Sequence, residues 1–277
     1  SGSVSLGKNY LKVKSRKLKI HEKQAYAACG QVILMNNFMK IFEKRKKKVA
    51  QILLTYSDTE DRRKSLNSRD TINEVLKYAI LPIINENDSV AVDELKFGDN
   101  DRLAARVAQI SNSDFLILLS DVDGLFTTNP KKSKSSKLVR VVEKIDKKII
   151  KMASNETNIY GTGGMSAKLE AADIAMSCGC STIICNGNIS KPIINFLNSS
   201  HGTIFVPRKK DKNKLKNWIA GTVRPSGKII IDNGATSAIS RRASLLPSGI
   251  IKVIGNFLKG DIVSIENEKG LKIGKGI

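Results

Sequence analysis

The sequence predicts an α/β domain built on a mostly parallel sheet, followed by a small β-barrel. Short apolar runs rich in β-branched residues show little alternation, which is typical of strands buried on both faces of a parallel sheet. Segments with a helical spacing of apolar residues lie between these runs, so we expect a three-layer α/β/α sandwich. After the lysine-rich stretch 208–216, short strand-like runs separated by Gly, Asn and Pro predict the barrel.

A helix is expected first, over 23–48, where apolar residues recur three and four apart and a closing basic run suits the helix C-terminus. The runs QILLT, ILPIINEN, FLILLS and STIICNG predict strands over 51–55, 80–87, 115–120 and 181–187. Further helices are predicted over 68–78, 101–110 and 166–177. From 224 onward, GKIIIDNGA, a short SAISRRAS helix, LLPSGIIKVIG and GDIVSIENEKG supply the barrel.

The boundary between the domains is expected near 221–226, and we assign residues 1–222 to the first domain and 223–277 to the second. Both domains are predicted to be incomplete. Ser1 stands where a strand should just have ended, and the chain stops at KGKGI without a closing strand, which would leave an unpaired sheet edge.

Lysine dominates the charge, since 47 Lys and Arg against 26 Asp and Glu give a formal net charge of +21. Such an excess can serve contact with nucleic acid phosphates. The basic runs 44–48, 131–137 and 208–216 lack interleaved aromatic residues that could stack on bases. Solvated surface lysine is therefore the favoured interpretation, with contact to an anionic polymer as the alternative.

The cysteines at 29, 178, 180 and 185 are too few and too irregular for a disulfide framework. The C-x-C at 178–180 has neither a second pair nor a nearby histidine, so we assign no metal-ligand residues. No stretch approaches the roughly 20 apolar residues that span a bilayer, and residues 1–11 lack the pattern of a signal peptide. We expect a cytoplasmic protein with reduced thiols and no membrane contact.

Four polar clusters follow predicted strands or open predicted helices: NENDSV at 85–90, GDND at 98–101, SDVDGLF at 120–126 and GTGGMSAK at 161–168. In an open parallel sheet, ligands bind beyond the carboxyl ends of the strands. We therefore expect these clusters to meet on one rim of the sheet, although they lie far apart in the sequence.

The glycine cluster can bind a nucleotide phosphate. It matches neither the P-loop, because Ala167 precedes Lys168, nor the dinucleotide fingerprint, because Ser166 takes the last glycine position. Its glycines can expose backbone N–H groups, Ser166 can begin a helix whose N-terminus favours anions, and Lys168 adds a full charge. A glycine-rich turn with a surface lysine is the alternative.

The acidic clusters contribute Asp88, Asp99 and Asp101, together with Asn85 and Asn100. Carboxylates and amides together suit a substrate ammonium group or a magnesium ion that carries water. The alternative for any one of them is capping of the helix at 101–110. In the third cluster, Ser120 and Asp121 can face a ligand, or the segment can be a plain turn.

Neither histidine, His21 or His201, lies in a cluster, so we assign no histidine base. A substrate that is already a nucleophile is therefore expected.

The four clusters, in this order, resemble the signature segments of the amino-acid kinase family, and specifically of its branch that phosphorylates the side chain of glutamate. The segments are INENDSV, FGDND, SDVDGLF and GTGGMSAK. The opening SGSVSLG resembles the segment that follows that family's second core strand. The part from Arg224 resembles the PUA domain that bacterial forms append. The resemblance covers essentially the whole chain.

The resemblance implies the amino-acid kinase fold and transfer of the γ-phosphoryl group of ATP, with Mg²⁺, to L-glutamate, which is the first step of proline biosynthesis. It implies contacts to glutamate for Ser1, Asp88 and Asn100, and catalytic roles for Lys168 and for Asp101, which would orient lysines. Contacts to ATP are implied for Ser120, Asp121, Thr162, Gly163, Gly164, Met165, Ser166, Ala167 and Lys168. Ser120 stands where the family more often has threonine, a change that keeps the hydroxyl.

Proline as a feedback inhibitor, a homodimer or homotetramer, and weak contact between the PUA domain and RNA are further implications. Two departures stand out, because the family's first strand, with its Lys-Leu-Gly-Ser/Thr-like phosphate-binding segment, is not found before Ser1, and the PUA domain lacks its last part. Either the chain is a fragment or it cannot bind ATP normally. The alternative functions are a kinase of the same family acting on aspartate, acetylglutamate, carbamate or UMP, and an RNA-binding PUA protein.

Overall fold

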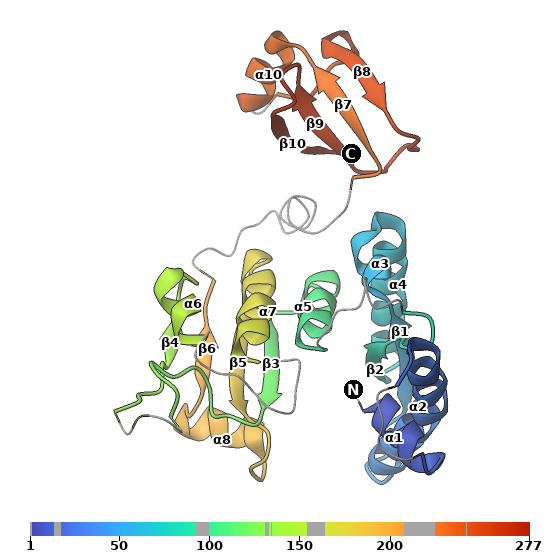
Figure 1. Ribbon diagram of the computed structural model, residues 1–277, viewed down its shortest axis with the longest axis vertical. Helices are drawn as coiled ribbons and strands as arrows, with labels where there is room; N and C mark the ends of the chain where they lie inside the picture. Colours follow the sequence, from blue (N-terminus) through green and yellow to red (C-terminus); the bar gives the residue numbers. More distant parts are fainter. Residues whose placement is uncertain are drawn as a thin grey trace.

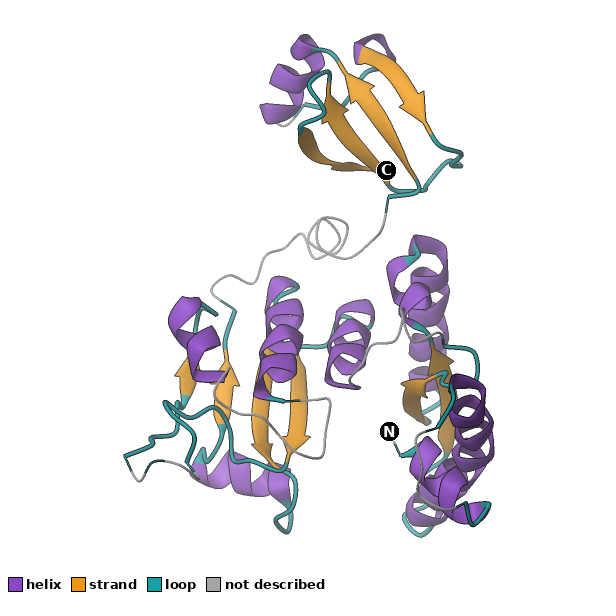
Figure 2. Ribbon diagram, viewed as in Figure 1, coloured by secondary structure: helices purple, strands orange, loops and turns teal. Residues whose placement is uncertain are grey.

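The computed structural model describes residues 2–13, 18–91, 100–130, 133, 135–153, 164–207, 225–241 and 243–277. Their strands form one two-stranded sheet and two four-stranded sheets, each accompanied by helices (Figures 1 and 2). The first two sheets belong to the predicted kinase domain and the third to the predicted barrel.

The two-stranded sheet pairs β1 (Val49–Leu54) with β2 (Leu81–Glu86) in parallel. Its helices are α1 (Ser3–Tyr10), α2 (Ile20–Glu43), α3 (Tyr56–Glu60) and α4 (Arg62–Lys77). Helix α2 packs on β1, α4 packs on β2, and α1 lies along α2. Helix α4 begins where the side chain of Asp61 accepts a hydrogen bond from the backbone N–H of Lys64 at 2.9 Å, which satisfies one of the open donors of the first turn.

The second sheet has the order β3-β5-β6-β4. Its strands are β3 (Phe115–Ser120), β4 (Val141–Val142), β5 (Ser181–Asn186) and β6 (Thr203–Phe205). Strands β3 and β5 pair in parallel, as do β4 and β6, whereas β5 and β6 pair antiparallel. Helices α5 (Asn100–Ile110), α6 (Lys147–Ala153), α7 (Met165–Ser177) and α8 (Pro192–Ser199) accompany this sheet.

Small side chains let α7 approach its neighbours closely. Ala171, Ala172 and Ala175 are fully buried, and α7 packs against both α5 and β5. They join the main hydrophobic core of the sheet, in which Phe205 and Ile184 are also fully buried. Such close packing fixes the first turns of α5 and α7, where two of the polar clusters end.

The third sheet, with the order β10-β9-β7-β8, consists of β7 (Gly227–Ile231), β8 (Ile250–Ile254), β9 (Val263–Asn267) and β10 (Lys272–Gly276). Helix α10 (Asn233–Ser240) and a short 3₁₀ helix (Pro247–Gly249) connect β7 to β8. Strands β7 and β9 are parallel, and the other two pairs are antiparallel. Within the described residues this sheet is open, with β8 and β10 at its edges.

The predicted α/β class with mostly parallel strands is confirmed, and the predicted strands agree with β1, β2, β3 and β5 to within two residues. Two helix predictions were inaccurate. The helix predicted over 23–48 is α2, which ends at Glu43, because the run of like charges that follows forms a turn in which Lys46 has a left-handed φ of 53°. The helix predicted over 68–78 begins six residues earlier, at Arg62, and is capped by Asp61. The boundary near 221–226 lies outside the described residues except at 225–226, so the domain assignment stays a prediction.

Candidate active site

Three amide side chains connect α2, the end of β2 and the start of α5. Asn85, which is 2% exposed, donates through Nδ2 to Oε1 of Gln31 at 3.0 Å. Its Oδ1 accepts a hydrogen bond from Nδ2 of Asn100 at 3.1 Å. Buried amides must be paired to avoid a desolvation cost of about 1–3 kcal/mol each, so this chain fixes Asn100 relative to β2.

A buried ion pair lies next to the amide chain. Nζ of Lys168 is 2.8 Å from Oδ2 of Asp101, and the two side chains are 11% and 16% exposed. Asp101 follows Asn100 in the first turn of α5, and Lys168 lies in the first turn of α7, which packs against α5. The ammonium group is therefore held in one place near the N-terminus of α7, where the helix dipole also favours an anion.

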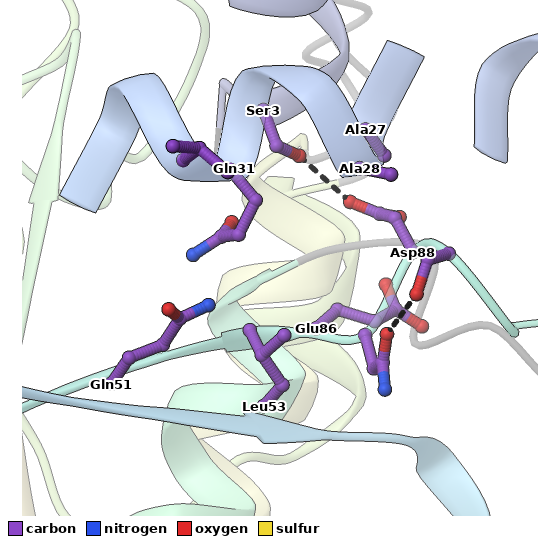
Figure 3. A pocket seen from close by; sticks show the side chains of 11 residues that line it. Ser3, Ala27, Ala28, Gln31, Gln51, Leu53, Glu86 and Asp88 are labelled. Carbon is purple, nitrogen blue, oxygen red and sulfur yellow. Dashed lines mark hydrogen bonds between the residues drawn. The ribbon is translucent and has the colours of Figure 1, made fainter. Parts of the chain in front are cut away.

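Asp88 follows β2 and lies beneath α1. Its Oδ2 accepts a hydrogen bond from Oγ of Ser3 at 3.1 Å (Figure 3). Helix α1 can reach this position because it crosses α2 at two glycines. A Cβ atom on Gly7 would lie 1.8 Å from the carbonyl oxygen of Tyr26, and one on Gly30 would lie 1.8 Å from that of Ser3.

Asp88 and Gln31 face a common cavity of about 250 Å³. The lining residues come from α1, α2, β1 and the end of β2, and are Ser3, Ala27, Ala28, Gln31, Val32, Gln51, Leu53, Glu86, Asn87, Asp88 and Ser89. Two carboxylates in a small cavity favour a positively charged group, such as the ammonium group of an amino acid.

The cluster after β3 combines two polar residues at the strand end with an anchored turn. Oγ of Ser120 donates to Oδ1 of Asp121 at 3.2 Å, beyond the carboxyl end of β3. The rest of the loop is anchored, because Nδ2 of Asn186, at the end of β5, donates to Asp123 at 2.9 Å and His201 lies 3.3 Å from the same carboxylate. Ser120 and Asp121 thus stand on the same rim as the end of β5.

Burial raises the pKa of the Cys185 thiol, next to this rim, above its ordinary value. The thiol is therefore protonated and a poor nucleophile at neutral pH.

The structure brings together several residues that the sequence singled out. Asn100, Asp101 and Lys168 are neighbours, and Asp88 lies in the cavity that the amide chain reaches. Helix α7 begins at Met165, one residue before the predicted Ser166.

The remaining predicted residues differ in burial, and some lie outside the described residues. Met165 is 3% exposed and belongs to the core, so it can contribute backbone to a nucleotide site but little side chain. Gly164 precedes α7 as its N-cap, Ser166 is exposed and Ala167 is partly buried. Ser1, Thr162 and Gly163 lie outside the described residues.

Sequence reasoning missed Gln31 and Ser3. Gln31 lies in the apolar run QVILM of a predicted helix, and a polar residue at such a position can signal a buried partner. The sequence offered no comparable signal for Ser3, because α1 is short and its role depends on the close crossing at Gly7 and Gly30.

Among the described residues, no group of three or more His, Cys, Asp and Glu side chains could hold a metal ion. None of the helices in the part of the chain that the structure describes is long and apolar enough to cross a membrane.

Residues 3–186 match the model of the amino acid kinase family, and residues 227–277 match that of the PUA domain. The chain belongs to the amino acid kinase family. Over all of its 277 residues, this amino acid kinase is 45% identical to a glutamate 5-kinase of Pelagibacter ubique and covers 75% of that protein. It is 42% identical over the same 277 residues to a glutamate 5-kinase of Bradyrhizobium diazoefficiens, of which it covers 74%.

A solved isopentenyl phosphate kinase of T. acidophilum aligns with 72% of this amino acid kinase and 78% of its own chain, at 14% identity and a TM-score of 0.48. That likeness is too low to carry an argument about the site.

Proposed function

We propose that this chain acts as a glutamate 5-kinase, which transfers the γ-phosphoryl group of ATP to the side-chain carboxylate of L-glutamate. The products are L-glutamyl 5-phosphate and ADP, and the reaction begins proline biosynthesis. The observation that carries the proposal is the full-length identity of 41–45% to curated glutamate 5-kinases. The buried Lys168–Asp101 pair beside Asn100 supports the proposal, because a fixed ammonium group would offset phosphoryl charge.

The attacking group requires no base. A glutamate side chain has a reference pKa near 4.3 and is ionised at neutral pH, so its oxygen attacks the γ-phosphorus directly while the bond to the β-phosphate oxygen breaks. The obstacle is the approach of two anions. Catalysis therefore depends on alignment and on cancelling negative charge.

The residues predicted from the sequence divide these tasks. Asp88 and Asn100, with Ser1, would hold glutamate, and Lys168 would offset the charge that develops on the transferring phosphoryl group. Asp101 would orient the lysine through its 2.8 Å ion pair. Ser120, Asp121 and residues 162–168 would contact ATP, with the N-terminus of α7 favouring its phosphates.

Mg²⁺ would enter with the nucleotide. Mg²⁺ commonly keeps several waters and binds substrate phosphates together with one or two carboxylates, and Asp121 beyond β3 is an oxygen donor of that kind. When bound, the ion neutralises phosphate charge.

We further propose that proline inhibits at the glutamate cavity, that the enzyme is a homodimer or homotetramer in the cytoplasm, and that its PUA domain makes at most weak contacts with RNA. The net charge of +21 is compatible with such contacts.

The proposal is tested with the complete natural protein by following ADP release and by trapping the acyl phosphate with hydroxylamine. L-glutamate, L-aspartate, acetylglutamate, carbamate and UMP are compared as acceptors. We expect hydroxamate to form only with ATP and L-glutamate. Turnover with a different acceptor alone, or RNA binding without any turnover, would overturn the proposal.

A further inference from the structure

We infer that Gln31 is a substrate-binding residue, whose side-chain N–H group donates a hydrogen bond to the carboxylate at the amino-acid end of the substrate. This inference rests on the proposed kinase function and assigns a role within its site.

The side chain of Gln31 ends in a donor that is buried and unused. Gln31 is 9% exposed, and among the described residues its Nε2 has no hydrogen-bond partner. Figure 3 shows this nitrogen turned toward the space between α2 and β1, where Gln51 lies opposite. An unsatisfied buried N–H group is costly, and a ligand acceptor would remove that cost.

The amide chain determines which end of Gln31 faces the cavity. An amide donates through nitrogen and accepts through oxygen. Because Asn100 donates to Asn85 and Asn85 donates to Gln31, the chain leaves Nε2 of Gln31 as its terminal donor. The reverse direction would require all three amides to turn over together, and would point an oxygen into a cavity that Glu86 and Asp88 already line with acceptors.

A neutral donor in this cavity complements its acids. Glu86 and Asp88 attract the ammonium group of an amino acid but repel its carboxylate. The neutral amide of Gln31 can donate to that carboxylate and forms no ion pair with Glu86 or Asp88. The order of the amides indicates which carboxylate of the substrate lies near Gln31. Asn100 adjoins the Lys168–Asp101 pair, and Gln31 is two amides farther from that pair. Gln31 therefore meets the α-carboxylate, and the side-chain carboxylate points toward Lys168.

The test compares Gln31→Leu, Gln31→Met and Gln31→Glu in the complete natural protein, with Gln24→Leu as a matched control. Gln24 lies on the same helix and uses its Nε2 to bond the carbonyl of Ala91 at 3.2 Å, outside the cavity lining. The KM for L-glutamate and for ATP, kcat, the calorimetric Kd of L-glutamate and the melting temperature are measured for each.

Gln31→Leu and Gln31→Met are expected to weaken the binding of L-glutamate roughly 10- to 100-fold, as loss of a hydrogen bond to a charged group does. The KM for ATP and kcat should stay within about threefold of the wild-type values. Gln31→Glu should bind L-glutamate more weakly still, because it adds a like charge. The inhibition constant of 4-aminobutanoate, which lacks the α-carboxylate, should be the same for wild type and Gln31→Leu.

Three results would overturn the inference: Leu and Met variants that bind L-glutamate like Gln24→Leu, a Glu variant that keeps wild-type affinity, or an equal loss of affinity for 4-aminobutanoate. Absence of turnover in the wild type would instead refute the proposed function, while the calorimetric Kd would still test Gln31.

Discussion

Two contacts fix the position of Lys168. Its ammonium group pairs with Asp101 at 2.8 Å, and the whole residue is only 8% exposed. Replacing Lys168 by Ala should lower kcat about 10²- to 10³-fold, as loss of a preorganised electrostatic contact does, and should leave the KM for glutamate nearly unchanged. Steady-state kinetics with the complete natural protein checks this. Lys148→Ala, which removes an exposed lysine, serves as the control. Unchanged turnover in Lys168→Ala would remove the role assigned to the lysine.

Asp88 should act on binding rather than on turnover. Its carboxylate faces the cavity and is oriented by the Ser3 hydroxyl at 3.1 Å. Asp88→Ala is expected to raise the KM for glutamate at least about tenfold, because the substrate ammonium group loses a charged partner. Ser3→Ala, which keeps the carboxylate and removes its orienting bond, should raise it only a few-fold. An unaltered KM in Asp88→Ala would contradict the assignment.

Among single residues, the sequence identified the polar clusters but not Gln31, which also lines the cavity. Asp88, Asn100, Asp101 and Lys168 lie in short polar clusters, and such clusters can be recognised at strand ends without coordinates. The unused donor of Gln31 could not be recognised, because it depends on the direction of two long-range hydrogen bonds. One joins residues that are 54 positions apart in the chain, and the other joins residues that are 15 positions apart.

The crossing of α1 and α2 is the element-level feature on which the cavity depends. At Gly30 there is no room for a methyl group, since a Cβ would lie 1.8 Å from the carbonyl oxygen of Ser3. Gly30→Ala should therefore destabilise the fold by about 3 kcal/mol or more, since it overpacks the crossing. It should also raise the KM for glutamate by displacing Ser3 from Asp88.

The measurement is the melting temperature, which should fall by roughly 10 °C at this size. Gly274→Ala, at a position with nothing within 4 Å of the added atom, should change it little. Equal melting temperatures for the two variants would show that α1 and α2 can move apart without a loss of stability.

Elements with long apolar or periodic patterns were predictable, whereas short ones were not. Strands β3 and β5 appear in the sequence as short, mostly apolar runs, and α5 as a periodic segment. Strand β6 has three residues, and it is defined by pairing with β4 and β5 rather than by its own sequence. Helix α1 likewise gains its stability from α2, because an eight-residue helix is marginal alone.

In the part of the chain that the structure describes, the first two sheets have strand edges that no other strand pairs with. Within the described residues, β2 pairs only with β1 and β3 pairs only with β5, while α5 packs on both β2 and β3. A cavity of about 380 Å³ opens beneath α5, lined by Pro82, Ile84, Asn100, Leu103, Ala104, Val107, Ala108, Ser113, Phe115, Leu116 and Ile117. Parallel strands are normally buried on both faces, yet Phe115 is 61% exposed and Leu119 is 51% exposed.

The chain covers 75% of its Pelagibacter relative, and a further strand, where the natural protein has one, would fit this gap. We predict that residues 1–277 alone bind the dye ANS more strongly and melt at a lower temperature than the complete natural protein, because a sheet edge with apolar side chains stays open. Within 1–277, Phe115→Ser should reduce dye binding more than Leu197→Ser, although Leu197 on α8 is 69% exposed. If the two proteins bind ANS equally, the edges of β2 and β3 are covered within residues 1–277 themselves.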